Sequence, residues 1–200
     1  GFPLDSLRRV VQSMADAAAE CRVAIVTGDT KVVDRGRGHG VYINTAGVGW
    51  VRDTVDVRPG RIQAGDAVIA SGDVGRHGIA VMGVRAGLEL GSTLQSDCAP
   101  LVDPVRALLD AKVDLHCLRD LTRGGLASGL AGVWLGPGVG MGDGEGLGPV
   151  PDAVRGACEL FGLDPLYVAN EGRMVAIVAA ADEAACLDAL RAHSVSSAAV

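Results

Sequence analysis

The most informative stretch of this sequence is LHCLRDLTRGGL, residues 115–126, which passes from one apolar run through polar residues into another. The run 115–118 is typical of a buried strand, and the run 126–134 of a helix. Between them Asp120, Thr122 and Arg123 stand beside two glycines, and polar groups packed so closely are costly unless each has a partner or a ligand. We therefore expect a strand, a candidate ligand-binding turn and a helix, in this order.

A second unit of the same kind precedes the first. Residues 67–70 predict a strand, SGDVGRHG at 71–78 predicts a glycine-rich turn, and residues 79–90 predict a helix. Exposed amides at such a helix start bind anions. The turn lacks the GK[ST] of a P-loop and the GxGxxG spacing of a dinucleotide fold, and His77 is more typical of a turn or capping residue. This motif by itself does not identify a function.

The rest of the chain alternates between helices and strands. Apolar periodicity predicts helices over 4–21, 104–111, 152–161 and 182–192, and short apolar runs predict strands over 23–26, 41–51 and 174–179. The connection at 53–65 carries proline and glycine, so we expect the domain boundary there, with one domain over 1–53 and a second over 54–200. The glycine-rich tract 136–148 predicts a mobile loop.

Composition excludes several classes of protein. The 200 residues are 48% hydrophobic and 21% charged, which is typical of a globular chain and not of a disordered one. The net charge of -6 argues against nonspecific nucleic-acid binding, because such binding depends on clustered Lys and Arg. No apolar run has the length of a membrane helix and no signal peptide is evident, so we expect no membrane association and a cytoplasmic location. The five cysteines lack CxxC spacing and predict neither zinc nor disulfides.

Two further stretches carry residues suited to catalysis. In TGDTK, residues 27–31, Gly28 permits close backbone approach, Asp29 offers an oxygen ligand for Mg²⁺, and Lys31 is suited to bind a phosphate or to act as a base. The alternative is an ordinary turn followed by a solvated lysine. In NEG, residues 170–172, Glu171 is a candidate general acid or base, and the alternative is a tight turn.

Taken together, four blocks resemble the hydrogenase maturation factor HypE family: AIVTGDTKVV (24–33), INTAG (43–47), DLTRGGL (120–126) and PLYVANEG (165–172). That family belongs to the superfamily of aminoimidazole ribonucleotide synthetase, selenophosphate synthetase and thiamine monophosphate kinase. The resemblance extends over almost the whole chain. It implies an α+β fold, with the end of a PurM-like N-terminal domain followed by most of a three-layer α/β/α PurM-like C-terminal domain.

The resemblance also implies an activity. HypE proteins are ATP-dependent dehydratases that convert a carboxamide on their C-terminal cysteine into a thiocyanate, the source of the iron cyanide ligands of nickel–iron hydrogenases. The implied partners are the carbamoyltransferase HypF, the HypC–HypD complex and a second copy of the chain. Lys31 and Glu171 match the family's proton-handling pair, and Asp29 matches the aspartate that binds Mg²⁺ with ATP. The implied nucleotide-site residues are Gly28, Asp29, Thr30, Asn44, Asp120, Thr122, Arg123, Gly124 and Gly125.

This chain also departs from the family pattern. The N-terminal half-domain with its Gly-Asp-Asp aspartates and the C-terminal Pro-Arg-Ile-Cys tail are missing from it, so we expect a piece of a longer protein that by itself neither turns over nor accepts a carbamoyl group. Arg76 replaces the aspartate that usually precedes His77, and the tract 136–148 replaces a more ordinary segment. The alternatives are another ATP-dependent enzyme of the superfamily, such as a selenophosphate synthetase or thiamine phosphate kinase, and a noncatalytic scaffold for maturation partners.

Overall fold

The computed structural model describes residues 2–88, 94–133 and 150–193. Its internal contacts divide the chain into two compact units, Gly1–Arg52 and Asp53–Val200. The predicted loop at 136–148 lies outside the described residues. No helix within the described ranges is both long enough and apolar enough to span a membrane.

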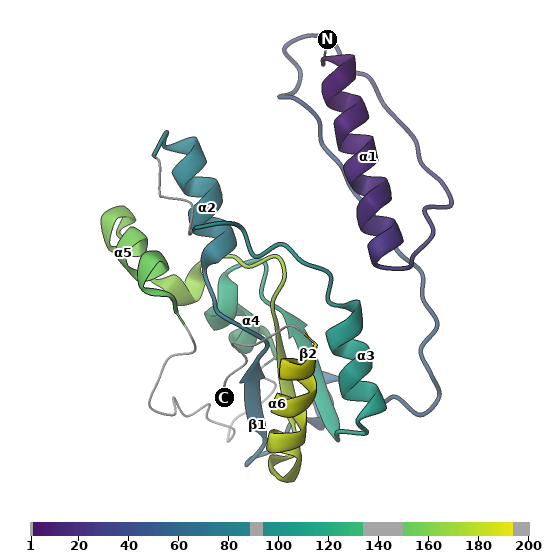
Figure 1. The fold of residues 1–200 in the computed structure, drawn as a ribbon, viewed down its shortest axis with the longest axis vertical. Helices are drawn as coiled ribbons and strands as arrows, with labels where there is room; N and C mark the ends of the chain where they lie inside the picture. The colour runs from purple at the N-terminus through teal and green to yellow at the C-terminus, as the bar shows by residue number, and fades with distance from the viewer. Residues whose placement is uncertain (1, 89–93, 134–149, 194–200) are drawn as a thin grey trace. The chain divides into compact units, whose positions relative to one another are not determined.

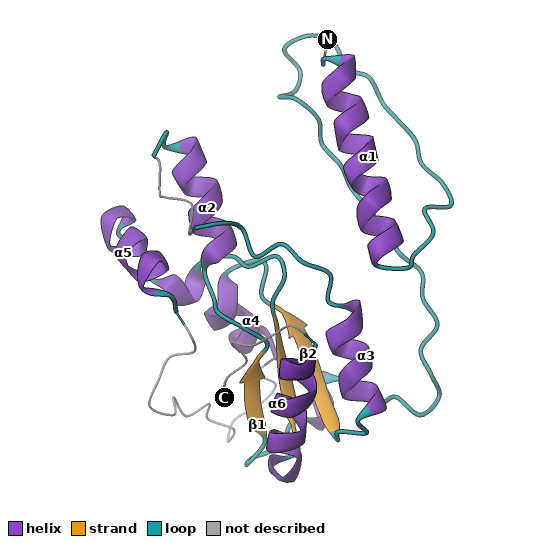
Figure 2. Ribbon diagram, in the orientation of Figure 1, coloured by secondary structure: helices purple, strands orange, loops and turns teal. Residues whose placement is uncertain are grey.

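The first unit contains one long helix, α1, which spans Leu4–Glu20 (Figures 1 and 2). It follows Pro3, whose fixed φ suits a helix start, and carries Asp5 in its first turn, where the helix dipole favours a negative charge. The predicted helix is therefore confirmed. One face of the helix is half-buried, at three- and four-residue spacing: Leu7, Val10, Met14, Ala18 and, just beyond its end, Cys21.

The strands expected over 23–26 and 41–51 are not formed. Residues 23–34 and 41–52 adopt no regular secondary structure, and Val26, Val48 and Trp50 expose 87%, 104% and 97% of their surface. A strand depends on hydrogen bonds to a neighbouring strand, and no described residue pairs with these segments. The apolar runs have a high β propensity, but propensity alone does not form a β-ladder.

The second unit is built on a three-stranded antiparallel sheet. Its strands are β1 (Ala67–Ala70), β2 (Leu115–Asp120) and β3 (Met174–Val178), in the spatial order β1-β3-β2. Both outer strands run antiparallel to β3. The carboxyl ends of β1 and β2 therefore lie at the same edge of the sheet as the amino end of β3. This topology decides which loops meet.

Helices cover both faces of this sheet. On one face Ala176 and Val178 pack against Leu108 of α3 (Val102–Asp110) and Leu190 of α6 (Glu183–Ala192). On the other face Val175 and Ile177 pack in a cluster with residues of α4 (Gly125–Val133). Every residue of β3 is buried, as expected of a central strand with both faces covered. The helix, sheet and helix layers (Figure 1) confirm the predicted three-layer α+β fold.

Two more helices form a smaller cluster beside the sheet. They are α2 (Arg76–Arg85) and α5 (Asp152–Phe161), whose buried residues Ile79, Val154 and Cys158 pack with Val168. Short 3-10 turns span Pro59–Arg61, Pro165–Tyr167 and Ala180–Asp182. Helix α2 begins three residues before the predicted start, so His77 lies in its first turn.

His116 forms a bulge in β2. Leu115 is opposite Val178 and Cys117 is opposite Ile177, so His116 is the extra residue. Its buried ring lies between two carboxylates, with Nδ1 2.7 Å from Asp66 Oδ2 and Nε2 3.3 Å from Asp114 Oδ2. Because of the bulge, Leu115 and Cys117 belong to the cores on opposite faces of the sheet. The alternation along a single strand does not reveal this switch.

Candidate functional site

Three loops meet at one edge of the sheet in the second unit. They follow β1 at 71–75, follow β2 at 121–124 and precede β3 at 170–173. All three contain motifs that the sequence singles out. The antiparallel pairing of β1 and β2 with β3 is what brings these motifs together, although they are far apart in the chain.

Asn170 joins the three loops. Its side chain is fully buried, and its Oδ1 accepts a 2.7 Å hydrogen bond from the Gly75 N–H. Its Nδ2 donates to the carbonyl oxygens of Leu121 at 3.3 Å and Val168 at 3.1 Å, and its backbone N–H also donates to Leu121 O. The sequence predicts a turn here, and the structure shows in addition a buried amide whose hydrogen bonds are satisfied by backbone groups.

Glu171, the predicted acid or base, follows this buried residue. Its backbone N–H donates to Asp97 Oδ1 at 2.9 Å, and its carboxylate Oε1 lies 4.0 Å from His77 Nε2. Its side chain is 36% exposed, so it remains open to a ligand. Asp97 is buried, and within the described ranges its Oδ2 has no hydrogen-bond partner. No sequence pattern indicates Asp97, because 74 positions separate it from Glu171.

A partly buried cluster of one aspartate and two arginines lies beside the same edge. Arg173 Nη2 lies 2.6 Å from Asp73 Oδ1, Arg173 Nε donates to the Asp73 carbonyl at 3.0 Å, and Arg76 pairs with the other carboxylate oxygen. Burial opposes ionisation of Asp73, but the hydrogen bonds from the two arginines hold the pKa of this carboxyl below its ordinary value. Arg76, which departs from the family pattern, therefore has a structural partner. Arg173 was missed in the sequence because its partner is 100 positions away.

The DLTRGG stretch combines exposed polar groups with constrained glycines. Asp120 is exposed and pairs with Arg119, Thr122 is half-buried and Arg123 is exposed. Gly124 and Gly125 have φ of +72° and +61°. A Cβ at Gly125 would lie 2.6 Å from the Val168 carbonyl and closer still to that of Leu166, so only glycine fits there.

The other predicted site residues belong to the first unit. Gly28, Asp29, Thr30, Lys31 and Asn44 are all exposed, and Asp29 Oδ1 accepts a 2.8 Å hydrogen bond from the Thr30 N–H. Among the described residues no group of three or more His, Cys, Asp or Glu side chains is arranged to hold a metal ion. Any Mg²⁺ at Asp29 would therefore need further oxygen ligands from a nucleotide, which is how proteins commonly hold this ion.

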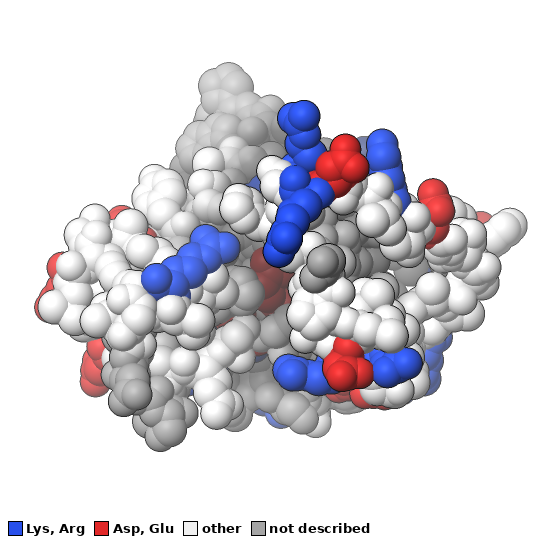
Figure 3. Space-filling view, turned by 90° about the horizontal axis from the view of Figure 1, so that it is seen from above, with Lys and Arg blue, Asp and Glu red and all other residues white. Residues whose placement is uncertain are grey.

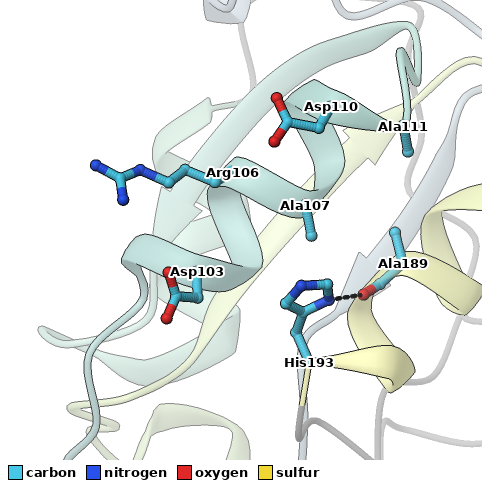
Figure 4. Close-up of a pocket in the computed structure, with 7 residues that line it drawn as sticks. All are labelled: Asp103, Arg106, Ala107, Asp110, Ala111, Ala189 and His193. Carbon is cyan, nitrogen blue, oxygen red and sulfur yellow. Dashed lines mark hydrogen bonds between the residues drawn. The ribbon is translucent and has the colours of Figure 1, made fainter.

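A separate groove lies between α3 and α6 and has a volume of ≈ 550 Å³ (Figure 4). In this view Ala107 of α3 faces the ring of His193, whose Nδ1 lies 3.1 Å from the Ala189 carbonyl, while Arg106 points away. None of the predicted site residues lines this groove.

Among the described residues, the surface charges form no single patch in the view of Figure 3. Acidic and basic side chains are interspersed on the visible face.

The fold and these motifs define a class of protein. The C-terminal domain of AIR synthase related proteins matches residues 63–200, and the N-terminal domain of the same family matches residues 1–51. The chain therefore belongs to the AIR synthase related family.

Within this family the chain is similar to HypE proteins, as the motifs predict. It is 50% identical to the carbamoyl dehydratase HypE of Cupriavidus necator over 193 residues, which cover 96% of this chain and 55% of that protein. For the Azotobacter vinelandii HypE the identity is 47%, covering 96% and 57%. The chain thus spans about half the length of the curated relatives it matches.

Solved HypE structures are also similar to this chain in fold. Escherichia coli HypE has a TM-score of 0.91 at 40% identity, covering 99% of this chain and 62% of that one. A HypE structure in complex with ATP has a TM-score of 0.82 at 36% identity, covering 100% and 60%. A HypE–HypF complex has a TM-score of 0.82 at 32% identity, covering 99% and 65%. The resemblance to HypE is confirmed in both sequence and fold.

Proposed function

We propose that the protein containing this chain is an ATP-dependent carbamoyl dehydratase that converts a cysteine-linked carboxamide into a thiocyanate for the maturation of nickel–iron hydrogenases. The observation that carries this proposal is the similarity to carbamoyl dehydratases over 96% of the chain. It includes every motif that the sequence analysis singles out for chemistry. The loops on the second unit that hold Glu171 and the DLTRGG stretch support it, because they meet at one sheet edge.

The chemistry requires an activated oxygen and a base. An amide oxygen is a poor leaving group, and ATP, when bound, supplies the phosphoryl group that lets this oxygen leave as phosphate. The carboxamide nitrogen must lose two protons as the carbon–nitrogen triple bond forms. In this proposal Lys31 and Glu171 handle these protons. Glu171 is suited to this task because its carboxylate is accessible while its backbone is held by Asp97.

The residues that we propose for nucleotide binding have suitable chemistry in each unit taken by itself. The donor chemistry fits: Asp29 and Asn44 offer exposed oxygen atoms, Arg123 offers an exposed cation for phosphate, and Gly124–Gly125 lets backbone approach closely. We assign Asp29 as the Mg²⁺ ligand, and the full set proposed to bind the nucleotide is Gly28, Asp29, Thr30, Asn44, Asp120, Thr122, Arg123, Gly124 and Gly125.

The organisation and partners belong to the same proposal. Residues 1–53 are the end of the nucleotide-binding domain, and residues 54–200 are the C-terminal domain. The partners are HypF, supported by the solved HypE–HypF complex, the HypC–HypD complex and a second copy of the protein in a homodimer. A cytoplasmic location goes with these partners.

Mass spectrometry of the full-length protein tests the activity. After incubation with the carbamoyltransferase and carbamoyl phosphate, the protein should gain one carbamoyl group and then lose one water when ATP is added. Lys31→Ala and Glu171→Ala should load normally and fail to dehydrate. Asp29→Ala should weaken Mg-ATP binding in calorimetry. A protein with its terminal cysteine that loads nothing would contradict the assignment, and normal dehydration in both variants would contradict the proton-handling roles.

A further inference from the structure

One short segment contacts both His77 and Glu171. The hydroxyl of Ser96 lies 2.9 Å from His77 Nδ1, and Asp97 Oδ1 accepts the Glu171 N–H at 2.9 Å. His77 lies in the first turn of α2, while Glu171 precedes β3. Two neighbouring residues thus contact the imidazole of His77 in one element and the backbone of Glu171 in another.

The contact with residues 171–172 is close. A Cβ at Gly172 would lie 2.7 Å from the Ala99 nitrogen and closer still to the Asp97 carbonyl oxygen. The backbone of 97–99 therefore lies directly against Gly172, which explains the glycine after Glu171. Since Asp97 is itself buried, the backbone position of Glu171 is well determined.

The contacts on both sides of the His77 ring favour one of its forms. Ser96 Oγ accepts the Cys98 N–H at 3.2 Å and can donate its own proton to His77 Nδ1. In a neutral imidazole an accepting Nδ1 implies a proton on Nε2. Nε2 is the atom that lies 4.0 Å from Glu171 Oε1. The opposite tautomer would turn a lone pair toward a carboxylate, which repels it.

We propose that His77, oriented by Ser96, is a positioning residue for Glu171: its Nε2–H holds the Glu171 carboxylate in the orientation needed for proton transfer. The inference rests on the proposed function, since it assigns Glu171 the proton-handling role. The 4.0 Å separation is longer than a hydrogen bond, and contacts of this kind commonly shorten when a substrate binds. The partly exposed Glu171 side chain has room for that movement.

The spectroscopic test is independent of turnover. In full-length protein labelled with ¹⁵N-histidine, the His77 ring should show a protonated Nε2 and an unprotonated Nδ1 at neutral pH. Ser96→Ala should weaken this preference, and Ser96→Thr, which keeps the hydroxyl, should preserve it. A wild-type ring protonated on Nδ1 alone, or one unaffected by Ser96→Ala, would overturn the inference.

The kinetic test separates positioning from general structure. His77→Gln should lower kcat for dehydration about 10-fold or more, part of the roughly 10²- to 10⁴-fold that acid–base groups supply, while KM for ATP changes less than about twofold. His193→Gln, in the groove between α3 and α6, is the matched control and should retain wild-type kcat.

Two outcomes would contradict the inference at different levels. If His77→Gln keeps wild-type kcat while Glu171→Gln is inactive, only the role of His77 is refuted. An active Glu171→Gln would refute the proton-handling role of Glu171, on which this inference rests, whereas a wild-type protein that never dehydrates its carboxamide would refute the proposed function. If His77→Gln does not fold, Ser96→Ala takes its place in the kinetic comparison.

Discussion

The side-chain oxygen of Asn170 accepts a 2.7 Å hydrogen bond from the backbone N–H of Gly75, 95 positions earlier in the chain. The amide nitrogen of the same residue donates to Leu121 O and Val168 O. One buried side chain thus fixes the loops that follow β1 and β2 against the segment that precedes β3. The residue next to it, Glu171, takes its position from this arrangement.

Removing this amide should be costly. Asn170→Ala leaves the Gly75 N–H and the Val168 carbonyl without their side-chain partner, and we expect the free energy of unfolding to fall by about 2–3 kcal/mol. Asn170→Asp keeps the acceptor for Gly75 but loses both donated bonds. Urea denaturation of the full-length protein measures both, with the exposed Gln95→Ala as control. Equal midpoints for wild type and Asn170→Ala would contradict the linking role.

Two glycine-to-alanine changes should have opposite signs. At Gly125, with φ of +61° and carbonyl oxygens where Cβ would stand, alanine should destabilise the protein by about 2 kcal/mol or more. At Gly156, inside α5, an added Cβ would meet no heavy atom within 4 Å outside its own stretch of helix, so alanine should stabilise the protein by about 0.5–1 kcal/mol. Thermal unfolding of the two variants in parallel checks both, and a stabilising Gly125→Ala would refute the steric argument.

The Asp73 ion pair should make stability depend on acid pH. Because the two arginines hold the pKa of Asp73 below 3.8, the folded state favours the carboxylate more than the unfolded chain does. This contribution is fully present above about pH 4 and is lost as pH falls through the lowered pKa. Asp73→Asn should therefore flatten the decline of stability below about pH 4, measured by urea denaturation at each pH. Arg173→Met, which leaves the buried carboxylate with one arginine fewer, should destabilise already at neutral pH; if it does not, the pairing is unimportant.

The buried thiols should lower stability at alkaline pH. Burial, with a smaller contribution from Asp182, raises the pKa of Cys186 from 9.0 to about 11. The unfolded chain therefore loses this proton first, and stability should fall between about pH 9 and 11, by up to about 3 kcal/mol from this thiol. Cys186→Ala should reduce that decline, and an unchanged alkaline profile would contradict this prediction.

The cysteines should also differ in reactivity. In the native protein at about pH 8, a thiol reagent should modify the exposed Cys98 well before Cys186, which mass spectrometry can follow.

Much of the second unit could be predicted from the sequence. The apolar runs at 67–70, 115–118 and 174–179 and the periodic segments at 104–111, 152–161 and 182–192 all form the expected elements, because burial of a strand or a helix face leaves a local trace in residue spacing. The same rule was wrong for 23–26 and 41–51, where β propensity finds no pairing partner among the described residues. Propensity is local, whereas a ladder needs two segments.

The candidate site divides in the same way. The sequence by itself determined which residues are suited to catalysis or binding, such as Glu171 and the DLTRGG stretch. It also determined the family that the chain resembles, because both inferences depend on residue type and on short spacing along the chain. Only the tertiary structure decided that Asp97 holds Glu171, that Ser96 orients His77 and that Arg173 neutralises Asp73. These pairs are 19 to 100 positions apart, and the antiparallel pairing of β1 and β2 with β3, together with the packing of the loops at one edge, brings them within a few ångströms. Such contacts depend on the global path of the chain, which no local pattern records.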